Sequence, residues 1–241
     1  MRLSWKNKLI VALDVSDPRK ALDIVDRLGD QAAVFKVGFE LFVTAGPGIV
    51  EEIQKRGKRV FLDLKFHDIP NTVTRAAIAA SRLGVYMFNV HTSGGLGMMK
   101  QCRDAVVELC IRENIQRPKI IGVTALTSLD SDILKNELDI HYSLKTHVKH
   151  LASLAFAAGL DGVVASPQEI GMIKRECGND FLVVTPGIRP SWVPPDDQKR
   201  TATPRQALRD GADYIVMGRG ILKQEEPEKA LELISLEMLT A

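Results

Sequence analysis

The chain lacks the features that would place it in a membrane or in a disulfide-bonded secreted fold. Its 241 residues contain only three cysteines, an odd number without metal-type spacing, which argues against a disulfide framework and fits a reducing compartment. The apolar run Leu9–Leu13 ends at Asp14 and is too short for a signal-peptide core or a membrane span. A net charge of +2 gives no reason to expect nucleic acid or a membrane surface as a partner. We therefore expect a cytoplasmic enzyme or binding protein.

Short apolar runs alternate with amphipathic stretches along the whole chain, without a linker or a low-complexity segment, so we expect one domain over residues 1–241. The strand-like runs are Leu9–Leu13, Ala33–Val37, Arg59–Leu64, Tyr86–Val90, Lys119–Val123, Gly162–Ala165, Phe181–Val184 and Tyr214–Met217. The helix-like stretches are Pro18–Leu28, Pro47–Arg56, Thr72–Leu83, Leu96–Arg112, Ser143–Ala158, Pro167–Cys177, Pro204–Asp210 and Glu226–Leu239. This alternation implies a parallel sheet. The number of units predicts a (β/α)8 TIM barrel of the α/β class, with a doubly wound open sheet as the alternative.

Most of the strand-like runs end in a polar residue or a glycine. These ends carry Asp14, Lys36 to Gly38, Asp63 with Lys65, Asn89 with His91, Thr124 with Thr127 and Ser128, and Gly218 with Arg219. In a barrel the carboxyl ends of the strands meet at one mouth, where barrel active sites lie. An open sheet would spread the same residues along a line, so the barrel explains their joint chemistry better.

The stretch 63–68, Asp-Leu-Lys-Phe-His-Asp, is the most informative in the chain. Alternate side chains of a strand share a face, so Asp63 and Lys65 are expected to point the same way. Lys36 interrupts a neighbouring buried run, where a lysine needs a counter-charge, and Asp63 is the obvious one. With Asp68 these residues would form two cations and two anions that hold one another without a metal. The alternative is an ordinary surface salt bridge, which contributes little.

Two segments pair glycine with arginine after the seventh and eighth runs. Thr185–Pro190 contains Gly187 and Arg189, and Val216–Gly220 contains Gly218 and Arg219. Barrels often bind phosphate with the loops after these two strands. Glycine lets backbone N–H groups approach an anion, and the guanidinium forks match phosphate oxygens. The alternative is a pair of turn glycines with solvated arginines.

The histidines give weaker signals. His141, His147 and His150 lie on one predicted helical stretch without an acidic or cysteine partner at metal spacing, so we interpret them as surface residues. His67, beside Asp68, is a candidate ligand or base, with a structural hydrogen bond as the alternative that we favour. His91, at the end of the fourth run, would line the mouth or support it. No metal site is predicted from this sequence.

Together these residues resemble the orotidine 5′-phosphate decarboxylase family, in its bacterial branch, over almost the whole chain. The motifs that carry the resemblance are Val11–Asp14, Lys36–Gly38, Phe61–Thr72, Asn89–His91, Val123–Ser128, Pro186–Pro190 and Gly218–Arg219. The Asp-x-Lys-x-x-Asp element at 63–68 is shared with magnesium-dependent sugar-phosphate decarboxylases. The nucleotide enzymes are favoured by Lys36, Leu126–Ser128 and Pro186–Pro190. At the position of Lys36 the sugar-phosphate relatives tend to carry an acidic residue instead.

The resemblance implies a carboxy-lyase that converts orotidine 5′-phosphate to uridine 5′-phosphate and carbon dioxide, the last step of de novo pyrimidine synthesis. It implies no cofactor, and a homodimer with shared active sites. Lys65 would protonate C6 of the pyrimidine, Asp63 would face the substrate carboxylate, and Lys36 would orient the array and the ribose. Asp68 and Thr72 would reach the site from the neighbouring subunit.

The resemblance also implies the remaining substrate contacts. They are Asp14 to the ribose, Thr127 to the pyrimidine ring, and Arg189, Gln198, Gly218 and Arg219 to the phosphate. One departure is the segment 190–198, where Trp192 and two adjacent prolines replace the small residues usual in the family's lid, which predicts a stiffer and more apolar lid. Two other functions are the alternatives: a magnesium-dependent sugar-phosphate decarboxylase or lyase on the same fold, and a non-catalytic phosphosugar-binding protein.

Overall fold

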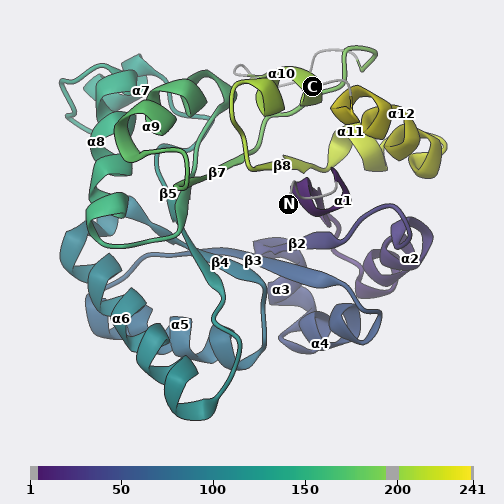
Figure 1. The fold of residues 1–241 in the computed structure, drawn as a ribbon, viewed down its shortest axis with the longest axis horizontal. Helices are drawn as coiled ribbons and strands as arrows, with labels where there is room; N and C mark the ends of the chain where they lie inside the picture. Colours follow the sequence, from purple (N-terminus) through teal and green to yellow (C-terminus); the bar gives the residue numbers. More distant parts are fainter. Residues whose placement is uncertain (1–4, 194–200, 240–241) are drawn as a thin grey trace.

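A computed structural model of the chain, which describes residues 5–193 and 201–239, contains a closed barrel of parallel strands in the order β1 to β8 (Figure 1). The strands are β1 (Leu9–Ala12), β2 (Val34–Gly38), β3 (Arg59–Phe66), β4 (Met87–His91), β5 (Lys119–Val123), β6 (Gly162–Val164), β7 (Leu182–Thr185) and β8 (Tyr214–Met217). The barrel closes where Val11 of β1 pairs with Met217 of β8. The predicted (β/α)8 fold is confirmed, because every strand begins and ends within two residues of its expected place. The open-sheet alternative is wrong.

Helices surround the strands, as Figure 1 shows. Those expected from the sequence are α2 (Pro18–Leu28), α4 (Gly48–Lys55), α5 (Pro70–Arg82), α6 (Gly95–Glu113), α8 (Leu144–Ala157), α9 (Ile170–Cys177), α10 (Pro204–Arg209) and α12 (Pro227–Leu239). Those not expected are α1 (Trp5–Lys8), α3 (Phe39–Ala45), α7 (Ser131–Asn136), α11 (Arg219–Leu222) and the 3₁₀ turns η1 (Thr92–Gly94) and η2 (Pro167–Glu169). None of the helices in the described part of the chain is long and apolar enough to cross a membrane.

Helix starts follow the local chemistry of the sequence. Pro18 is the first residue of α2, and the Asp17 carboxylate accepts a hydrogen bond from the Arg19 backbone N–H, which satisfies a donor that the helix itself cannot. Pro70 begins α5, and the residue before it, Ile69, is extended with ψ 151°, as the steric demand of a following proline predicts. The expected helix over 167–177 instead begins with the 3₁₀ turn η2, where the Glu169 side chain accepts the backbone N–H of Ser166 at 2.8 Å.

Two apolar layers result from the alternation of strand side chains. One layer packs the outer faces of the strands against the helices, and it also contains the free cysteines Cys102, Cys110 and Cys177. The other fills the barrel interior with Ile10, Val34, Phe61, Met87, Ile121, Val184 and Tyr214. Burying one such side chain contributes about 1.5–3 kcal/mol. Two residues further along β1, β2 and β3, the same inward alternation presents Ala12, Lys36 and Asp63 to the mouth of the barrel.

Candidate active site

Three charged side chains from the adjacent strands β2 and β3 meet at the mouth: Lys36, Asp63 and Lys65, which form a charged array. The Asp63 carboxylate binds both cations: its Oδ2 lies 3.3 Å from Lys36 Nζ, and its Oδ1 lies 2.8 Å from Lys65 Nζ. Asp14, which follows β1, places Oδ1 3.0 Å from the same Lys36 ammonium. Because Lys36 and Asp63 are mostly buried while Asp14 is half exposed, the Lys36 ammonium has one sheltered and one solvated carboxylate partner.

Burial and charge act in opposite directions on Lys36. Desolvation is the largest influence and lowers the pKa of this ammonium, but the carboxylates of Asp63 and Asp14 together outweigh it and leave the pKa raised. Lys36 is therefore a fixed positive charge at neutral pH.

Lys65 does not continue the regular strand. Its φ is +43°, and the pairing of β3 with β4 shifts register between Leu62 and Phe66. The expected meeting of Lys65 with Asp63 is confirmed by their 2.8 Å contact, but an irregular backbone, and not simple alternation, brings the two side chains together. The strand pairing is irregular at this point, and such irregularities often re-aim a side chain beside a site.

Asn89 of β4 binds both partners of this pair. Its Oδ1 accepts the Lys65 backbone N–H at 2.7 Å, and its Nδ2 donates to Asp63 Oδ1 at 2.7 Å. The side chain is fully buried. The sequence marked Asn89 only as a polar strand end. A buried carboxamide within the apolar run Met87–Val90 was the available signal for more, because such a group needs partners for both of its ends.

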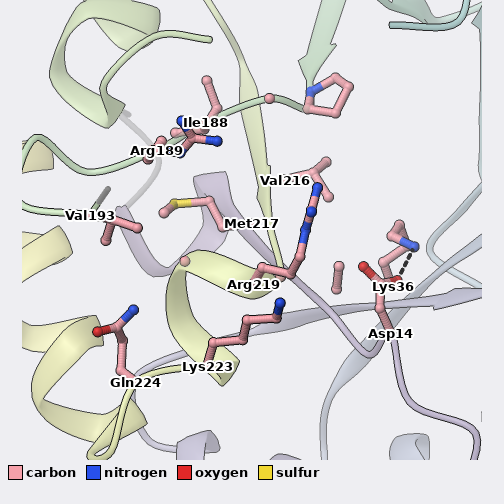
Figure 2. Close-up of a pocket in the computed structure, with 15 residues that line it drawn as sticks. Asp14, Lys36, Ile188, Arg189, Val193, Val216, Met217, Arg219, Lys223 and Gln224 are labelled. Carbon is pink, nitrogen blue, oxygen red and sulfur yellow. Dashed lines mark hydrogen bonds and ion pairs between the residues drawn. The ribbon is translucent and has the colours of Figure 1, made fainter. Parts of the chain in front are cut away.

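Two cavities open at the mouth and share Lys36, Pro186 and Val216. The first, of about 200 Å³, combines the array with an apolar lining, and its other residues include Phe61, Asp63, Lys65, Val123, Ala125, Thr127, Val164 and Val184. The second, of about 350 Å³, lies beside the ends of β7 and β8, and its other residues include Asp14, Gly187, Arg189, Gly218, Arg219, Lys223 and Gln224 (Figure 2). The first can hold a flat ring with few polar contacts, and the second can hold an anion.

Glycine is required at two points of the second cavity. Gly187 has φ +74°, a region that side-chain-bearing residues rarely adopt. At Gly218 a Cβ would lie 2.9 Å from Asp14 Oδ2, so a larger residue would displace that carboxylate. Lys223 and Gln224, at and just after the end of α11, were not predicted from the sequence, because only the short helix α11 brings them to this cavity.

Some predicted site residues lie elsewhere. Asp68 and Thr72 are exposed and line neither cavity, and the Asp68 carboxylate accepts the backbone N–H of its own neighbour Ile69 at 2.6 Å. Thr127 lines the first cavity, and Arg189, Gly218 and Arg219 line the second. The predicted phosphate contact Gln198 falls outside the described residues.

The histidines divide into two groups. His67 and His91 pack ring to ring with centroids 5.1 Å apart, and burial, followed by the charges of His67 and Lys65, lowers the pKa of His91. His147 and His150 lie on α8, but His141 lies before it, so their expected placement on one helix is wrong for His141. Within residues 5–193 and 201–239 no group of three or more His, Cys, Asp or Glu side chains is arranged to hold a metal ion.

Comparisons with known proteins agree with this geometry. A sequence model of the "Orotidine 5'-phosphate decarboxylase / HUMPS family" matches residues 7–234. An orotidine 5′-phosphate decarboxylase of Moorella thermoacetica is 49% identical over 238 residues, covering 99% of this chain and 94% of its own. One from Syntrophotalea carbinolica is 48% identical over 241 residues, covering 100% of this chain and 98% of its own.

Two solved structures share this fold over nearly the full length of the chain. The crystal structure of orotidine 5′-phosphate decarboxylase from Lactobacillus acidophilus superposes with a TM-score of 0.85 at 38% identity, covering 96% of this chain and 99% of the other. An uncharacterized conserved protein from Geobacillus kaustophilus superposes with a TM-score of 0.82 at 37% identity, covering 95% and 99%. With an array of two lysines and an aspartate between an apolar cavity and two glycine–arginine segments, and with this similarity over nearly its full length, the chain belongs to the orotidine 5′-phosphate decarboxylase family.

Proposed function

We propose that the chain decarboxylates orotidine 5′-phosphate to uridine 5′-phosphate, the final step of pyrimidine nucleotide synthesis, without a metal or cofactor. The observation that carries the proposal is the position of Lys65 and Asp63 side by side at the wall of the apolar cavity, 2.8 Å apart. The names of the similar proteins support the same substrate.

The two cavities match the two halves of this substrate. The pyrimidine ring would occupy the apolar cavity, where Thr127 offers a hydroxyl to its edge. The phosphate would occupy the second cavity, near Arg189, Gly218 and Arg219, with Gln198 proposed to reach it from outside the described residues. The ribose would cross between the cavities beside Lys36, which lines both, and Asp14, which lines the second.

The chemistry follows from these positions. The bond between C6 and the carboxylate carbon breaks, carbon dioxide leaves, and the electron pair stays on C6, where a proton from Lys65 Nζ then forms the new C–H bond. An ammonium about 4 Å from the developing charge contributes roughly 4 kcal/mol of attraction at an effective dielectric near 20. The hydrogen bond and ion pair to Asp63 hold this charge in place before the reaction, as electrostatic catalysis requires.

Asp63 has a second role in the proposal. Its carboxylate would face the carboxylate of the substrate, and this repulsion disappears when neutral carbon dioxide forms. The two cations that bind Asp63, at 3.3 Å and 2.8 Å, hold its carboxylate in place, so the repulsion falls on the substrate.

The proposal includes a homodimer in which Asp68 and Thr72 complete the site of the neighbouring subunit. Both residues are exposed and lie outside the cavities of their own chain. Apolar side chains nearby are also exposed, 67% for Ile69 and 54% for Phe39, over whose ring Lys65 Nζ lies at 5.4 Å. Covering such side chains is a common reason for association.

We further propose that residues 1–241 form one catalytic domain that works in the cytoplasm, where the three buried cysteines stay reduced.

One assay tests the reaction and the absence of a metal together. Purified protein is treated exhaustively with EDTA, and the ultraviolet absorbance of orotidine 5′-phosphate is followed, with uridine 5′-phosphate and carbon dioxide quantified at the end. We expect full turnover after chelation, loss of turnover in Lys65→Ala, and no change in Lys20→Ala, which removes an exposed cation of α2. Absence of turnover in the parent protein contradicts the proposal. Turnover that disappears with EDTA and returns with magnesium favours a metal-dependent enzyme instead.

A further inference from the structure

We propose that Asn89 is a positioning residue that sets the geometry of the proton donor and of the carboxylate beside it. This inference rests on the proposed decarboxylation. Asn89 Oδ1 accepts the backbone N–H of Lys65, and Asn89 Nδ2 donates to Oδ1 of Asp63, both at 2.7 Å. One carboxamide thus connects the main chain of one residue to the side chain of the other.

The backbone at Lys65 needs such a partner. A φ of +43° is unfavourable for a residue with a side chain and persists only when its surroundings enforce it. The register shift between β3 and β4 removes this N–H from the regular ladder, and Asn89 accepts it instead. Because the direction of the Lys65 side chain depends on this backbone, the Asn89 bond also aims the ammonium.

The second bond fixes the Asp63 carboxylate. Its Oδ1 accepts from both Asn89 Nδ2 and Lys65 Nζ, at 2.7 Å and 2.8 Å, while Oδ2 lies 3.3 Å from Lys36 Nζ. Contacts to both oxygens prevent the carboxylate from rotating. Asn89 is fully buried, so water does not compete for these bonds, and a lost partner is not replaced.

The carboxamide of Asn89 supplies an acceptor and a donor at once. Leucine at position 89 is similar in size but lacks both groups. Aspartate keeps the acceptor for the Lys65 N–H but places a second carboxylate where Asp63 Oδ1 requires a donor. These two substitutions therefore separate the shape of Asn89 from its hydrogen bonds.

For Asn89→Leu we expect kcat to fall about 100-fold, the effect typical of a displacement near 1 Å in a catalytic group. KM for orotidine 5′-phosphate should change less than about threefold, because the proposed phosphate and ribose contacts come from other strands. The matched control is Thr92→Val. Thr92 is also buried just after β4, and its hydroxyl donates to the Val123 carbonyl at 2.8 Å without touching the array. It should lose thermal stability and keep its kcat.

Asn89→Asp gives a readout that a purely structural role would not produce. Its kcat should be low at neutral pH and recover as the pH falls, because the introduced acid, once protonated, can donate to Asp63 as the carboxamide does. The parent protein should lack this recovery.

Two measurements keep this inference separate from the proposed reaction. If the parent protein does not turn over orotidine 5′-phosphate, the proposed function fails, and the crystal structure of Asn89→Leu still reports whether Lys65 leaves φ +43° and Asp63 rotates. If the parent is active, a kcat for Asn89→Leu within threefold of the parent and of Thr92→Val overturns the positioning role. A variant structure with Lys65 and Asp63 unmoved overturns it as well.

Discussion

Burial, and not distance, should decide how strongly Lys36 couples to its two acidic neighbours. Lys36 Nζ lies closer to Asp14, at 3.0 Å, than to Asp63, at 3.3 Å. The side chains of Lys36 and Asp63 are 11% and 13% exposed, whereas that of Asp14 is 53% exposed. Removing Lys36 therefore leaves one carboxylate in a sheltered place and the other largely in water.

The magnitudes follow from Coulomb's law. Across the 3.3 Å to Asp63, an effective dielectric near 20 gives roughly 5 kcal/mol of attraction, whereas a water-like dielectric gives roughly 1.4 kcal/mol across the 3.0 Å to Asp14. Desolvation of the charges and lost side-chain freedom reduce both values. We expect a net coupling of about 2–3 kcal/mol between Lys36 and Asp63, and below about 1 kcal/mol between Lys36 and Asp14.

Two double-mutant cycles measure these couplings. One combines Lys36→Met with Asp63→Asn and the other combines Lys36→Met with Asp14→Asn, and each uses the free energies of unfolding in urea at neutral pH. The shared Lys36→Met variant makes the cycles directly comparable. A coupling to Asp14 equal to or above the coupling to Asp63 would refute the reasoning, because the shorter distance would then outweigh the difference in exposure.

Three further predictions concern phosphate binding, pH and the dimer. Arg219→Ala should weaken binding of a nucleotide analogue by about 1.5–3 kcal/mol, as expected for a charge-assisted contact, while nucleoside binding measured by calorimetry stays unchanged; equal losses would place Arg219 away from the phosphate. Burial, His67 and Lys65 lower the pKa of His91 in the folded protein, against the opposing charge of Asp63, so the unfolded chain takes up a proton below about pH 6.5 that the folded chain resists. Stability should therefore fall as the pH drops below this value, and a His91→Gln variant with an equally steep loss in urea unfolding would assign the effect elsewhere. Mixing inactive Lys65→Ala and Asp68→Ala dimers should restore roughly a quarter of the unmutated protein's activity once subunits exchange at random. If mass spectrometry verifies the exchange and the activity stays as low as that of the two variant dimers, Asp68 belongs to its own chain's site.

The sequence predicts the barrel and the contents of its mouth because both depend on local patterns. A buried parallel strand requires an apolar run, and the polar residue after it marks the carboxyl end. For this reason the predicted convergence of Lys36, Asp63 and Lys65 is confirmed by their contacts. The glycine–arginine segments at Gly187 and Gly218 likewise line one cavity, because the loops after β7 and β8 are neighbours in any closed barrel.

The departures arise where the conformation depends on a partner distant in sequence. No local pattern indicates that Lys65 adopts φ +43°, because the group that accepts its N–H is Asn89, 24 residues later on another strand. The short helices α3 and α11 were missed for a related reason. With 7 and 4 residues they have too few turns to establish a helical period; α3 packs against β2 and α11 against α12.

The position of Asp68 connects the fold to the proposed dimer. Of the four charges that the resemblance assigns to catalysis, three lie within ion-pair distance in one chain. The fourth, Asp68, is exposed, and its carboxylate accepts the backbone N–H of Ile69. Phe66 ends β3, and Pro70 begins α5, so the four residues from Phe66 through Ile69 carry the chain away from the mouth. Ile69 is extended before Pro70, and Asp68 lines neither cavity of its own chain. In the proposed dimer, Asp68 would therefore complete the site of the second subunit, and the turn that begins α5 would make activity depend on dimerisation.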